Sequence, residues 1–513
     1  MGRAVSTLRL SALRAVLLSL AALAVLPAVA RAADSFADAS RPNNNGDCLT
    51  PATACKTIGG PDGALAKATA GFAVHVEPGT YAENVTLNTG VSLVADSGNP
   101  VIEPATGPAV TVTGGPGPHI TGLTFASSAA GPEVILRDAA GNAIVGDNSF
   151  IDRTPADANA VTGIRTTSTG APKIANNSFT LLQDGVDVLP PATGAPGRPE
   201  ITANIIVGTQ GLGSGISVES TNIPGVTGPT TAVLTGNDIE QGGPESIGVS
   251  VLDRGSAVGD PSVPGAGATL VRNRILGGGN GLVDFGARAP LTLFGDVIAR
   301  TGSVSDGRSP IRAFQTVGLG GQLTVTNADL VANPNPAIQL SGIHINLDSS
   351  IVAGSIFQED GADCTITFSA GLTGSGNSCQ TFQAIPPVRF LDQENSDFHL
   401  DPALDLALID HGNPATPPLE GMLDLDGDPR VIDGACPIGA VRDIGADEFN
   451  PGALNCAPSD PPGGGGVAGT PPAGGTQASR PSTGKRASAL KRCKRKHGNA
   501  RRSCIRKARL LPL

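Results

Sequence analysis

The sequence predicts an all-β solenoid whose short strands stack as a parallel β-helix. Three observations indicate this fold: a recurring six-residue unit, a second strand pattern after each copy, and too little sequence between them for helices. The unit reads apolar, two spacer residues, Asn, one variable residue, apolar, and successive copies are 23 to 36 residues apart. Repeats of this length are typical of stacked architectures, because one unit cannot bury its own apolar face. The copies are Val145 to Phe150, Ile174 to Phe179, Ile201 to Ile206, Leu234 to Ile239, Leu270 to Ile275 and Leu293 to Ile298.

The second strand pattern begins with Gly and alternates apolar with polar residues, as in the segment 215–218. Side chains on a strand alternate between two faces, so one face of each strand is expected to point inward. Gly, Asn, Asp and Pro fill the intervals, which leaves no room for a crossover helix of ten or more residues. Asp238 with Arg274, and Arg165 with Asp187, are then outward neighbours in successive coils and are expected to form ordinary lateral ion pairs.

The fixed Asn of the unit is predicted to stack in a column, one side chain per coil. Stacked Asn side chains can pass amide hydrogen bonds along such a column, so we interpret them as a structural ladder. The pattern decays after its last copy, where Ala328 occupies the Asn position. The ladder positions are Asn148, Asn177, Asn204, Asn237, Asn273 and Asp296.

The two ends of the chain differ from its body. Residues 1–32 carry Arg residues, then an apolar run and a small-residue cleavage site, which predicts a signal peptide and no transmembrane span in the mature chain. Residues 457–484 are predicted to form a Pro/Gly-rich flexible linker. Residues 485–513 form a basic tail, with 13 Lys or Arg and no Asp or Glu from Arg480 onward in a chain of net charge −10. The tail suits anionic wall polymers or lipid headgroups, whereas export and scarce aromatics disfavour nucleic acid.

The eight cysteines are expected to form disulfides, because an even count in an exported chain favours them. Sequence neighbours are the predicted partners, since short loops bring them together most often. The spacings do not match those of zinc sites, and His partners are missing. The predicted pairs are Cys48 with Cys55, Cys364 with Cys379, Cys436 with Cys456, and Cys493 with Cys504.

Motifs at both ends of the body carry a resemblance to a known family. The run from Val74 to Val85 resembles the opening coil of bacterial secreted, right-handed parallel β-helix proteins grouped with pectin lyases. The Ala-rich segment from Ala64 to Ala70 is similar to the short amphipathic helix that caps such rods, where it would cover a strand edge and the apolar core. This resemblance implies a right-handed β-helix solenoid, with a cap at residues 33–72 and coils at 73–360.

The segment that follows the coils resembles the closing module of choice-of-anchor bacterial surface proteins. The resemblance rests on Asp397 to Leu400, Leu408 to Asp410, Asp424 to Arg430, and Asp443 to Phe449. It implies a C-terminal closing module at residues 361–456. These motifs inform architecture and say little about chemistry.

The resemblance makes a carbohydrate-active enzyme an alternative, but fold alone does not establish activity. The sequence lacks the Asn-Thr-Asp strand, Asp-Asp pair, Gly-His-Gly and Arg-Ile-Lys motifs of galacturonan hydrolases, and catalytic residues remain unassigned. Platforms for sugar rings are scarce, with no Trp and one Tyr in the chain. A polysaccharide lyase or glycoside hydrolase is therefore the less favoured interpretation, and a lyase would need calcium.

Three alternating carboxylates are the weak metal candidates: Asp424, Asp426 and Asp428. They resemble part of a calcium loop but lack its remaining ligands, so a simple Asp-Gly turn is favoured. No cofactor is expected, with calcium kept open. We predict a non-catalytic secreted or cell-surface protein, a monomer that uses its β-helix for adhesion or envelope contact and its basic tail as a tether. Extracellular polysaccharide or an anionic envelope polymer is the expected partner.

Overall fold

The computed structural model describes residues 33–449 apart from 128–129, 139–140, 154–160, 210, 255–264, 287, 300–307, 316–320, 332–335, 372–382, 385–387, 389, 394–395, 415–422 and 433–440. The predicted signal peptide, linker and basic tail therefore lie outside the described residues. So do Cys379, Cys436, Cys456, Cys493 and Cys504. No helix within the described part of the chain is long and apolar enough to cross a membrane.

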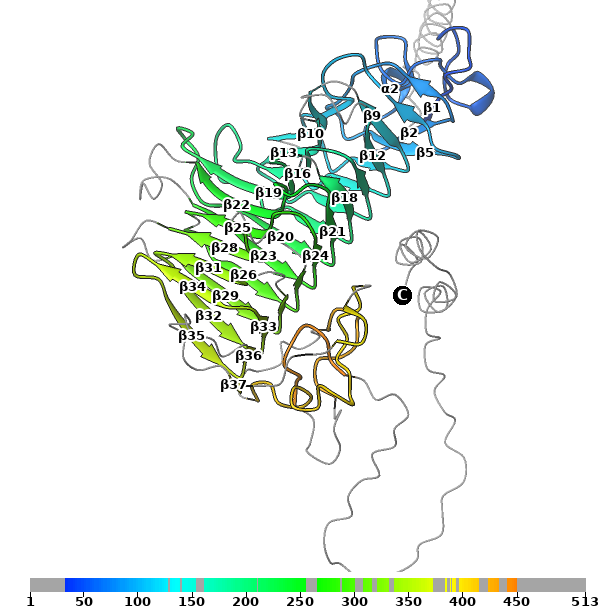
Figure 1. The fold of residues 1–513 in the computed structure, drawn as a ribbon. Coiled ribbons are helices and arrows are strands. Elements are labelled where there is room, and N and C mark those ends of the chain that lie inside the picture. Colours follow the sequence, from blue (N-terminus) through cyan, green and yellow to red (C-terminus); the bar gives the residue numbers. More distant parts are fainter. Residues whose placement is uncertain are drawn as a thin grey trace, which may run out of the picture.

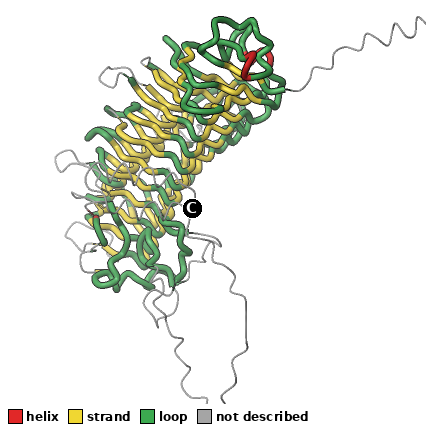
Figure 2. The backbone as a smooth tube through the Cα atoms, turned by 90° about the vertical axis from the view of Figure 1, so that its right-hand side faces the viewer, coloured by secondary structure: helices red, strands yellow, loops and turns green. Residues whose placement is uncertain are grey.

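The described chain winds through three all-parallel sheets of 13, 11 and 13 strands, which we name sheets A, C and B (Figure 1). Regular coils contribute one strand to each sheet, and each strand pairs with its equivalents in the coils before and after it. These observations confirm the predicted fold class, an all-β, right-handed parallel β-helix. The coils stack into an elongated, curved rod, as Figure 2 also shows.

Sheet A contains, in order, β1 (Ser35–Ala37), β2 (Ala73–Val76), β5 (Ser92–Ala95), β8 (His119–Thr121), β11 (Ile144–Gly146), β14 (Lys173–Ala175), β17 (Glu200–Thr202), β20 (Thr230–Thr235), β23 (Ala266–Val271), β26 (Leu291–Phe294), β29 (Gln322–Thr326), β32 (His344–Asp348) and β35 (Asp363–Thr367). Sheet B contains β3 (Thr80–Tyr81), β6 (Val101–Ile102), β9 (Thr124–Ser127), β12 (Ser149–Asp152), β15 (Ser178–Thr180), β18 (Ile205–Thr209), β21 (Asp238–Gln241), β24 (Arg274–Leu276), β27 (Val297–Ala299), β30 (Asp329–Val331), β33 (Ile351–Ala353), β36 (Ala370–Gly371) and β37 (Gln383–Ala384). Sheet C contains β4 (Val85–Leu87), β7 (Val110–Val112), β10 (Gly131–Asp138), β13 (Val161–Ser168), β16 (Asp184–Val188), β19 (Ser214–Thr221), β22 (Ile247–Arg254), β25 (Asn280–Phe285), β28 (Ile311–Phe314), β31 (Ile338–Ser341) and β34 (Ile356–Glu359).

The core of the rod is a stack of inward apolar side chains held in register by this pairing. On sheet B, Phe125, Phe150 and Phe179 are fully buried and stack with ring centroids 4.9 and 4.7 Å apart. Offset stacking at this spacing matches the distance between neighbouring strands. The apolar residues that frame the repeat unit are therefore the core residues of successive coils.

The repeated Asn occupies the turn from sheet A to sheet B and continues as a column of side-chain hydrogen bonds. The residue before it is left-handed in coil after coil, for example Ala203 with φ 54° and Gly236 with φ 62°. The Nδ2 group of Asn204 donates to Asn237 Oδ1 at 3.0 Å and to the carbonyl of Ile174 at 2.9 Å. Its Oδ1 accepts from both the main-chain N–H and the Nδ2 of Asn177, each at 3.0 Å. The amide thus satisfies backbone groups that the sharp turn removes from the sheets.

The same contacts link Asn148, Asn177, Asn204, Asn237 and Asn273, and the last amide donates to Asp296 Oδ1 at 2.9 Å. Asp296 is fully buried, and it has no amide hydrogen to pass onward. Burial raises its pKa to about 7. In the following coils hydroxyl groups take over, because Ala328 N–H donates to Ser350 Oγ and Ser350 N–H donates to Ser369 Oγ, both at 3.1 Å.

A small cap covers the N-terminal end of the rod. Strand β1 extends sheet A beyond β2, and η1 (Pro51–Thr53) and the short helix α2 (Ala64–Lys67) lie beside it. Ala64 is buried in the same core as the coils, and Ser35 Oγ donates to its carbonyl at 2.8 Å. The structure confirms the predicted disulfide between Cys48 and Cys55, which closes the loop that holds η1. Cys364 is also disulfide-bonded, but its predicted partner is not among the described residues.

The C-terminal end of the rod is covered by an irregular segment. Strands continue past residue 360 to β37, and the following irregular segment lies along the side of the rod (Figure 1). We name its described residues within 390–449 the closing module. The module covers outward apolar side chains of the last sheet B strands. These residues are Leu276, Val297, Ala299, Val331, Ile351 and Ala370, and their module partners are Phe390, Phe398, Leu400, Leu408, Ile409, Ile444 and Ala446.

Candidate functional site

Outward charges on the middle coils form ion pairs between neighbouring strands. Arg165 Nη2 lies 2.9 Å from Asp187 Oδ2 across β13 and β16, and Arg274 Nη2 lies 2.8 Å from Asp238 Oδ1 across β24 and β21. Both predicted pairs are confirmed. Such pairs contribute on the order of 0.2 to 1 kcal/mol when they are partly exposed. Each pair joins register neighbours in successive coils, and it holds the Arg side chain against a carboxylate.

A second acidic group stands beside one of these pairs on sheet C. Asp184 and Asp187 both lie on β16, and the main-chain N–H of Ser214 donates to Asp184 Oδ1 at 2.7 Å. Burial raises the pKa of Asp184 to about 7, and burial also raises the pKa of Asp187 despite its contact with Arg165. Two carboxylates with an adjacent Arg are a donor set that a uronate-binding site with calcium would use.

Sheet A carries on its outward surface a line of uncharged polar residues, which lies beside charged residues such as the ion pair of His344 and Asp363. One position of five consecutive strands carries Thr or Asn, and parallel pairing places these residues in one line along the rod. We name them the threonine row: Thr269, Thr292, Thr324, Asn346 and Thr365. Thr292 and Thr324 lie side by side in the middle of the row and are partly exposed. The spacing between neighbours is the inter-strand distance, about 4.8 Å.

The closing module uses buried carboxylates as acceptors for its own main chain. Asp424 Oδ1 accepts from the N–H groups of Asp426, Gly427 and Asp428 at 3.0, 2.8 and 2.7 Å, and its Oδ2 accepts from Glu448 N–H at 3.1 Å. The two oxygens of Asp443 accept from the N–H groups of Asp410 and Phe449 at 2.7 and 2.6 Å. The described part of this module has only isolated bridges, so carboxylates supply the acceptors that sheet partners supply in the coils.

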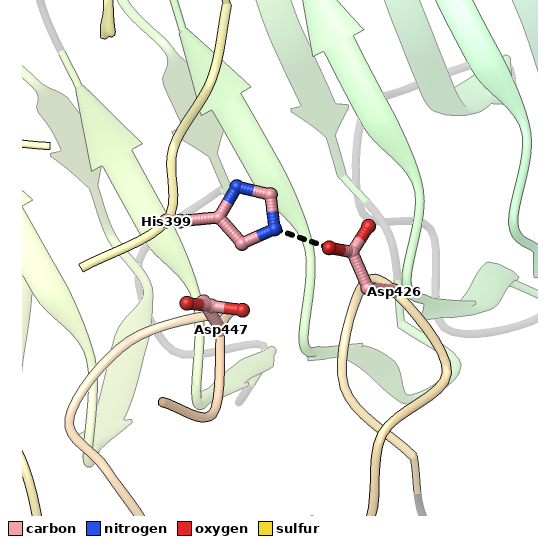
Figure 3. A group of neighbouring side chains, drawn as sticks. All are labelled: His399, Asp426 and Asp447. Atoms are coloured by element: carbon pink, nitrogen blue, oxygen red, sulfur yellow. Dashed lines mark hydrogen bonds and ion pairs between the residues drawn. The ribbon is translucent and has the colours of Figure 1, made fainter. Parts of the chain in front are cut away.

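One His and two carboxylates of this module come together from three separate segments (Figure 3). His399 follows the bridge between Asp392 and Asp397, and Asp426 lies at the tip of the turn closed by the bridge between Leu423 and Pro429. Asp447 follows Ala446, which is packed in the apolar contact with sheet B. One potential ligand atom from each of the three residues lies within 4.8 Å of the other two. We name His399, Asp426 and Asp447 the His–Asp cluster.

The electrostatics of the His–Asp cluster are strongly shifted by these contacts. The two ring nitrogens of His399 contact carboxylate oxygens of Asp397 and Asp426. Hydrogen bonds to these two carboxylates raise the pKa of His399 to about 11. Burial raises the pKa of Asp447 to about 7, although the charge of His399 opposes this shift. The His399 imidazolium is therefore held between the carboxylates of Asp397 and Asp426.

The structure separates the three carboxylates that the sequence grouped. Asp424 is a buried acceptor for its own turn, Asp426 points to His399, and Asp428 is not a member of the cluster. His399 and Asp447 were not predicted as site residues. Both stand in motifs that resemble the closing-module family, but 48 residues separate them. Their convergence depends on how irregular segments pack on sheet B, for which sequence spacing gives no rule.

Comparisons with known proteins give a likeness of fold. No protein-family model matches the sequence, and no curated protein matches it significantly. A solved rhamnogalacturonan lyase is similar over 60% of this chain and 84% of its own, with 11% sequence identity and a TM-score of 0.36. The solved pectate lyase Pel9A is similar over 82% of this chain and 98% of its own, with 13% identity and a TM-score of 0.33. Likeness at this level concerns the course of the chain and identifies no catalytic or binding residue.

Proposed function

We propose that this chain is a non-catalytic secreted or cell-surface protein that binds an extracellular polysaccharide along sheet A. The observation that carries the proposal is the threonine row. Its members stand in register at about 4.8 Å along one line. Thr269 already accepts from Arg198, and Asn346 and Thr365 contact His344, so Thr292 and Thr324 are the members that offer their hydroxyl groups as donors and acceptors. A polymer with many hydroxyl groups can use several of them at once, and its multiple weak contacts then add up to useful affinity.

The charge of the surface indicates the class of polymer. The side chains of Thr292 and Thr324 make no hydrogen bond within the described residues, so their hydroxyl groups are available to a ligand. The row is uncharged, whereas the whole chain has a net charge of −10 that repels polyanions at long range. A neutral polysaccharide fits both features. The basic tail, with the opposite charge, is the proposed tether to anionic polymers of the envelope.

The proposal is tested by cosedimentation of the purified chain with a panel of insoluble neutral polysaccharides. The double variant Thr292→Val, Thr324→Val removes two hydroxyl groups and keeps the shape and the strand preference of both residues. Two lost hydrogen bonds at about 1 kcal/mol each correspond to roughly 30-fold weaker binding. Thr86→Val with Thr111→Val is the matched control, because these residues are register neighbours on sheet C.

The control variant should bind like the unmodified chain. Failure to bind any neutral polysaccharide, or equal binding by both double variants, would reject the threonine row as the binding surface. A separate deletion of residues 480–513 should release the protein from cells without changing its affinity for the polysaccharide. Retention on cells after this deletion would contradict the tether.

A second function, calcium-assisted β-elimination on an acidic polysaccharide, is favoured by one observation, the group of Asp184, Asp187 and Arg165 on sheet C. In that case the carboxylates would hold calcium against a uronate, and Arg would approach the reacting sugar. Incubation with uronate polymers, with and without calcium, tests it through the appearance of unsaturated chain ends. Product that depends on calcium and disappears in Asp184→Asn would replace the non-catalytic proposal.

A further inference from the structure

We propose that His399, Asp426 and Asp447 bind a divalent metal ion of the zinc and manganese class. The cluster brings one imidazole and two carboxylates from three segments of the closing module to one point (Figure 3). The inference does not depend on polysaccharide binding, because the cluster lies in the closing module rather than on the threonine row.

The geometry suits a small ion after slight side-chain adjustment. The potential ligand atoms lie within 4.8 Å of one another. Ligands around a tetrahedral zinc ion, at bond lengths near 2.1 Å, are about 3.4 Å apart. The His399 and Asp426 side chains are 41% and 54% exposed, which leaves them room to rotate towards this spacing. The same exposure lets the ion enter and lets water complete its coordination.

Asp447 gives the independent indication of a ligand. Its side chain is only 5% exposed, and its Oδ2 accepts a single hydrogen bond, from Leu400 N–H at 3.2 Å. Its other oxygen, Oδ1, accepts no hydrogen bond from the described residues. A carboxylate that is 5% exposed and accepts a single hydrogen bond keeps unused acceptor capacity, and a cation beside it would offset the cost of burying its charge. The neighbouring imidazole and the Asp426 carboxylate are placed to share such a cation.

The donor set determines the class of metal. One imidazole nitrogen with two carboxylate oxygens suits zinc or manganese, whereas calcium prefers six to eight oxygen ligands. Asp397, which contacts the other ring nitrogen of His399, would then act as the carboxylate that orients a metal-binding imidazole. The expected role is structural, because the ion would join three irregular segments that otherwise have only isolated bridges between strands.

The test uses the full chain, purified in chelator and then dialysed. Isothermal titration with zinc, manganese and calcium chlorides measures affinity, and thermal unfolding measures stability. We expect one zinc ion to bind at this cluster and to raise the Tm by a few °C at saturating metal. His399→Asn, Asp426→Asn and Asp447→Asn should each weaken binding at least 10-fold. Asp428→Asn, in the same turn but outside the cluster, is the matched control and should bind like the unmodified chain.

Cobalt provides a readout specific to the imidazole, since its visible absorption bands should change when His399→Asn removes the nitrogen ligand. This variant alters a half-exposed side chain, so it keeps the test meaningful even if Asp447→Asn fails to fold. Zinc affinity that is unchanged in both His399→Asn and Asp426→Asn would overturn the proposal, as would the lack of any zinc-dependent rise in Tm. Binding of calcium in preference to zinc would overturn the proposed class of metal.

Discussion

The coils and the closing module bury polar groups in two different ways. In the coils, the buried groups of the ladder are neutral amides, each of which donates and accepts in the same pattern as its neighbours. In the closing module they are mainly ionisable, with Asp424, Asp443 and Glu448 almost fully buried. Amides repeat because the same turn recurs in every coil. Carboxylates recur in the module because each one satisfies several N–H groups of a different irregular loop.

The closing module also contains buried Arg side chains, which donate to main-chain carbonyls and to Asn. Arg430 is 3% exposed, and its Nη groups donate to the carbonyls of Gly445 and Ala446 at 2.9 and 2.5 Å. Arg442 Nη1 donates to Asn327 Oδ1 at 3.1 Å, which ties the module to the rod. These Arg side chains bind polar groups of the backbone and of Asn. The module therefore contains several buried ionisable groups, whereas the ladder of the coils has one, Asp296, at its end.

Removing one ladder amide should have the largest effect. Asn204→Ala leaves the main-chain N–H and the Nδ2 of Asn177 without an acceptor. Each buried donor that loses its partner costs about 1–3 kcal/mol, so we expect the free energy of unfolding to fall by about 2–6 kcal/mol. Thermal and denaturant unfolding followed by circular dichroism measures the loss.

Asn99→Ala is the matched control for this variant, because it makes the same chemical change at an exposed turn. It should change stability by less than about 0.5 kcal/mol. A similarly small change in Asn204→Ala would show that the column does not stabilise the coils.

The next effect concerns pH and sits at the interface between the two regions. Asp329 is 1% exposed on β30, and its Oδ1 accepts from Ala446 N–H of the module at 3.0 Å. Burial raises its pKa to about 8 from 3.8. Between these values the folded chain holds a proton that the unfolded chain releases. Stability should therefore fall as pH rises from about 4 to 8, by at most about 1.4 kcal/mol per pH unit for this group.

Asp329→Asn keeps the acceptor and stays neutral, so the fall in Tm between pH 5 and pH 8 should become smaller in chelator. The pKa values of Asp443 and Glu448, raised by burial to about 7 and 9, act in the same direction and preserve part of the slope. Asp62→Asn, at an exposed site in the cap, should leave the slope unchanged. A uniform drop in Tm of Asp329→Asn at both pH values would contradict the role of its ionisation.

The same contrast explains which features the sequence could predict. The fold class followed from a repeat in which inward apolar residues and outward charges alternate, because every coil obeys the same local rule. The Cys48–Cys55 disulfide followed from short spacing in the same way. The packing of the module could not be predicted, since Val297, Val331 and Ile351 look like ordinary strand residues until a partner covers their outward side. The His–Asp cluster was missed for this reason, because its members meet only through that packing.

The smallest effect concerns the residue before the ladder Asn, which tests whether the column imposes the left-handed turn. Ala203 adopts φ 54° at this position, and Gly236 adopts φ 62° one coil later, with no atom within 4 Å of the position that a Cβ would occupy. This conformation costs an L-residue roughly 1–2 kcal/mol, which Gly avoids. The greater freedom of Gly in the unfolded chain removes part of that advantage. Ala203→Gly should therefore stabilise the fold by up to about 1 kcal/mol.

Gly236→Ala is the reciprocal variant and should destabilise by about the same amount, since only the backbone conformation opposes the added methyl group. Shifts in the free energy of unfolding that are equal in size and opposite in sign would show that both coils impose the same turn geometry on the residue at this position. A neutral Gly236→Ala would show instead that the turn relaxes when Cβ is added. The Asn column would then follow the conformation of each turn rather than enforce it.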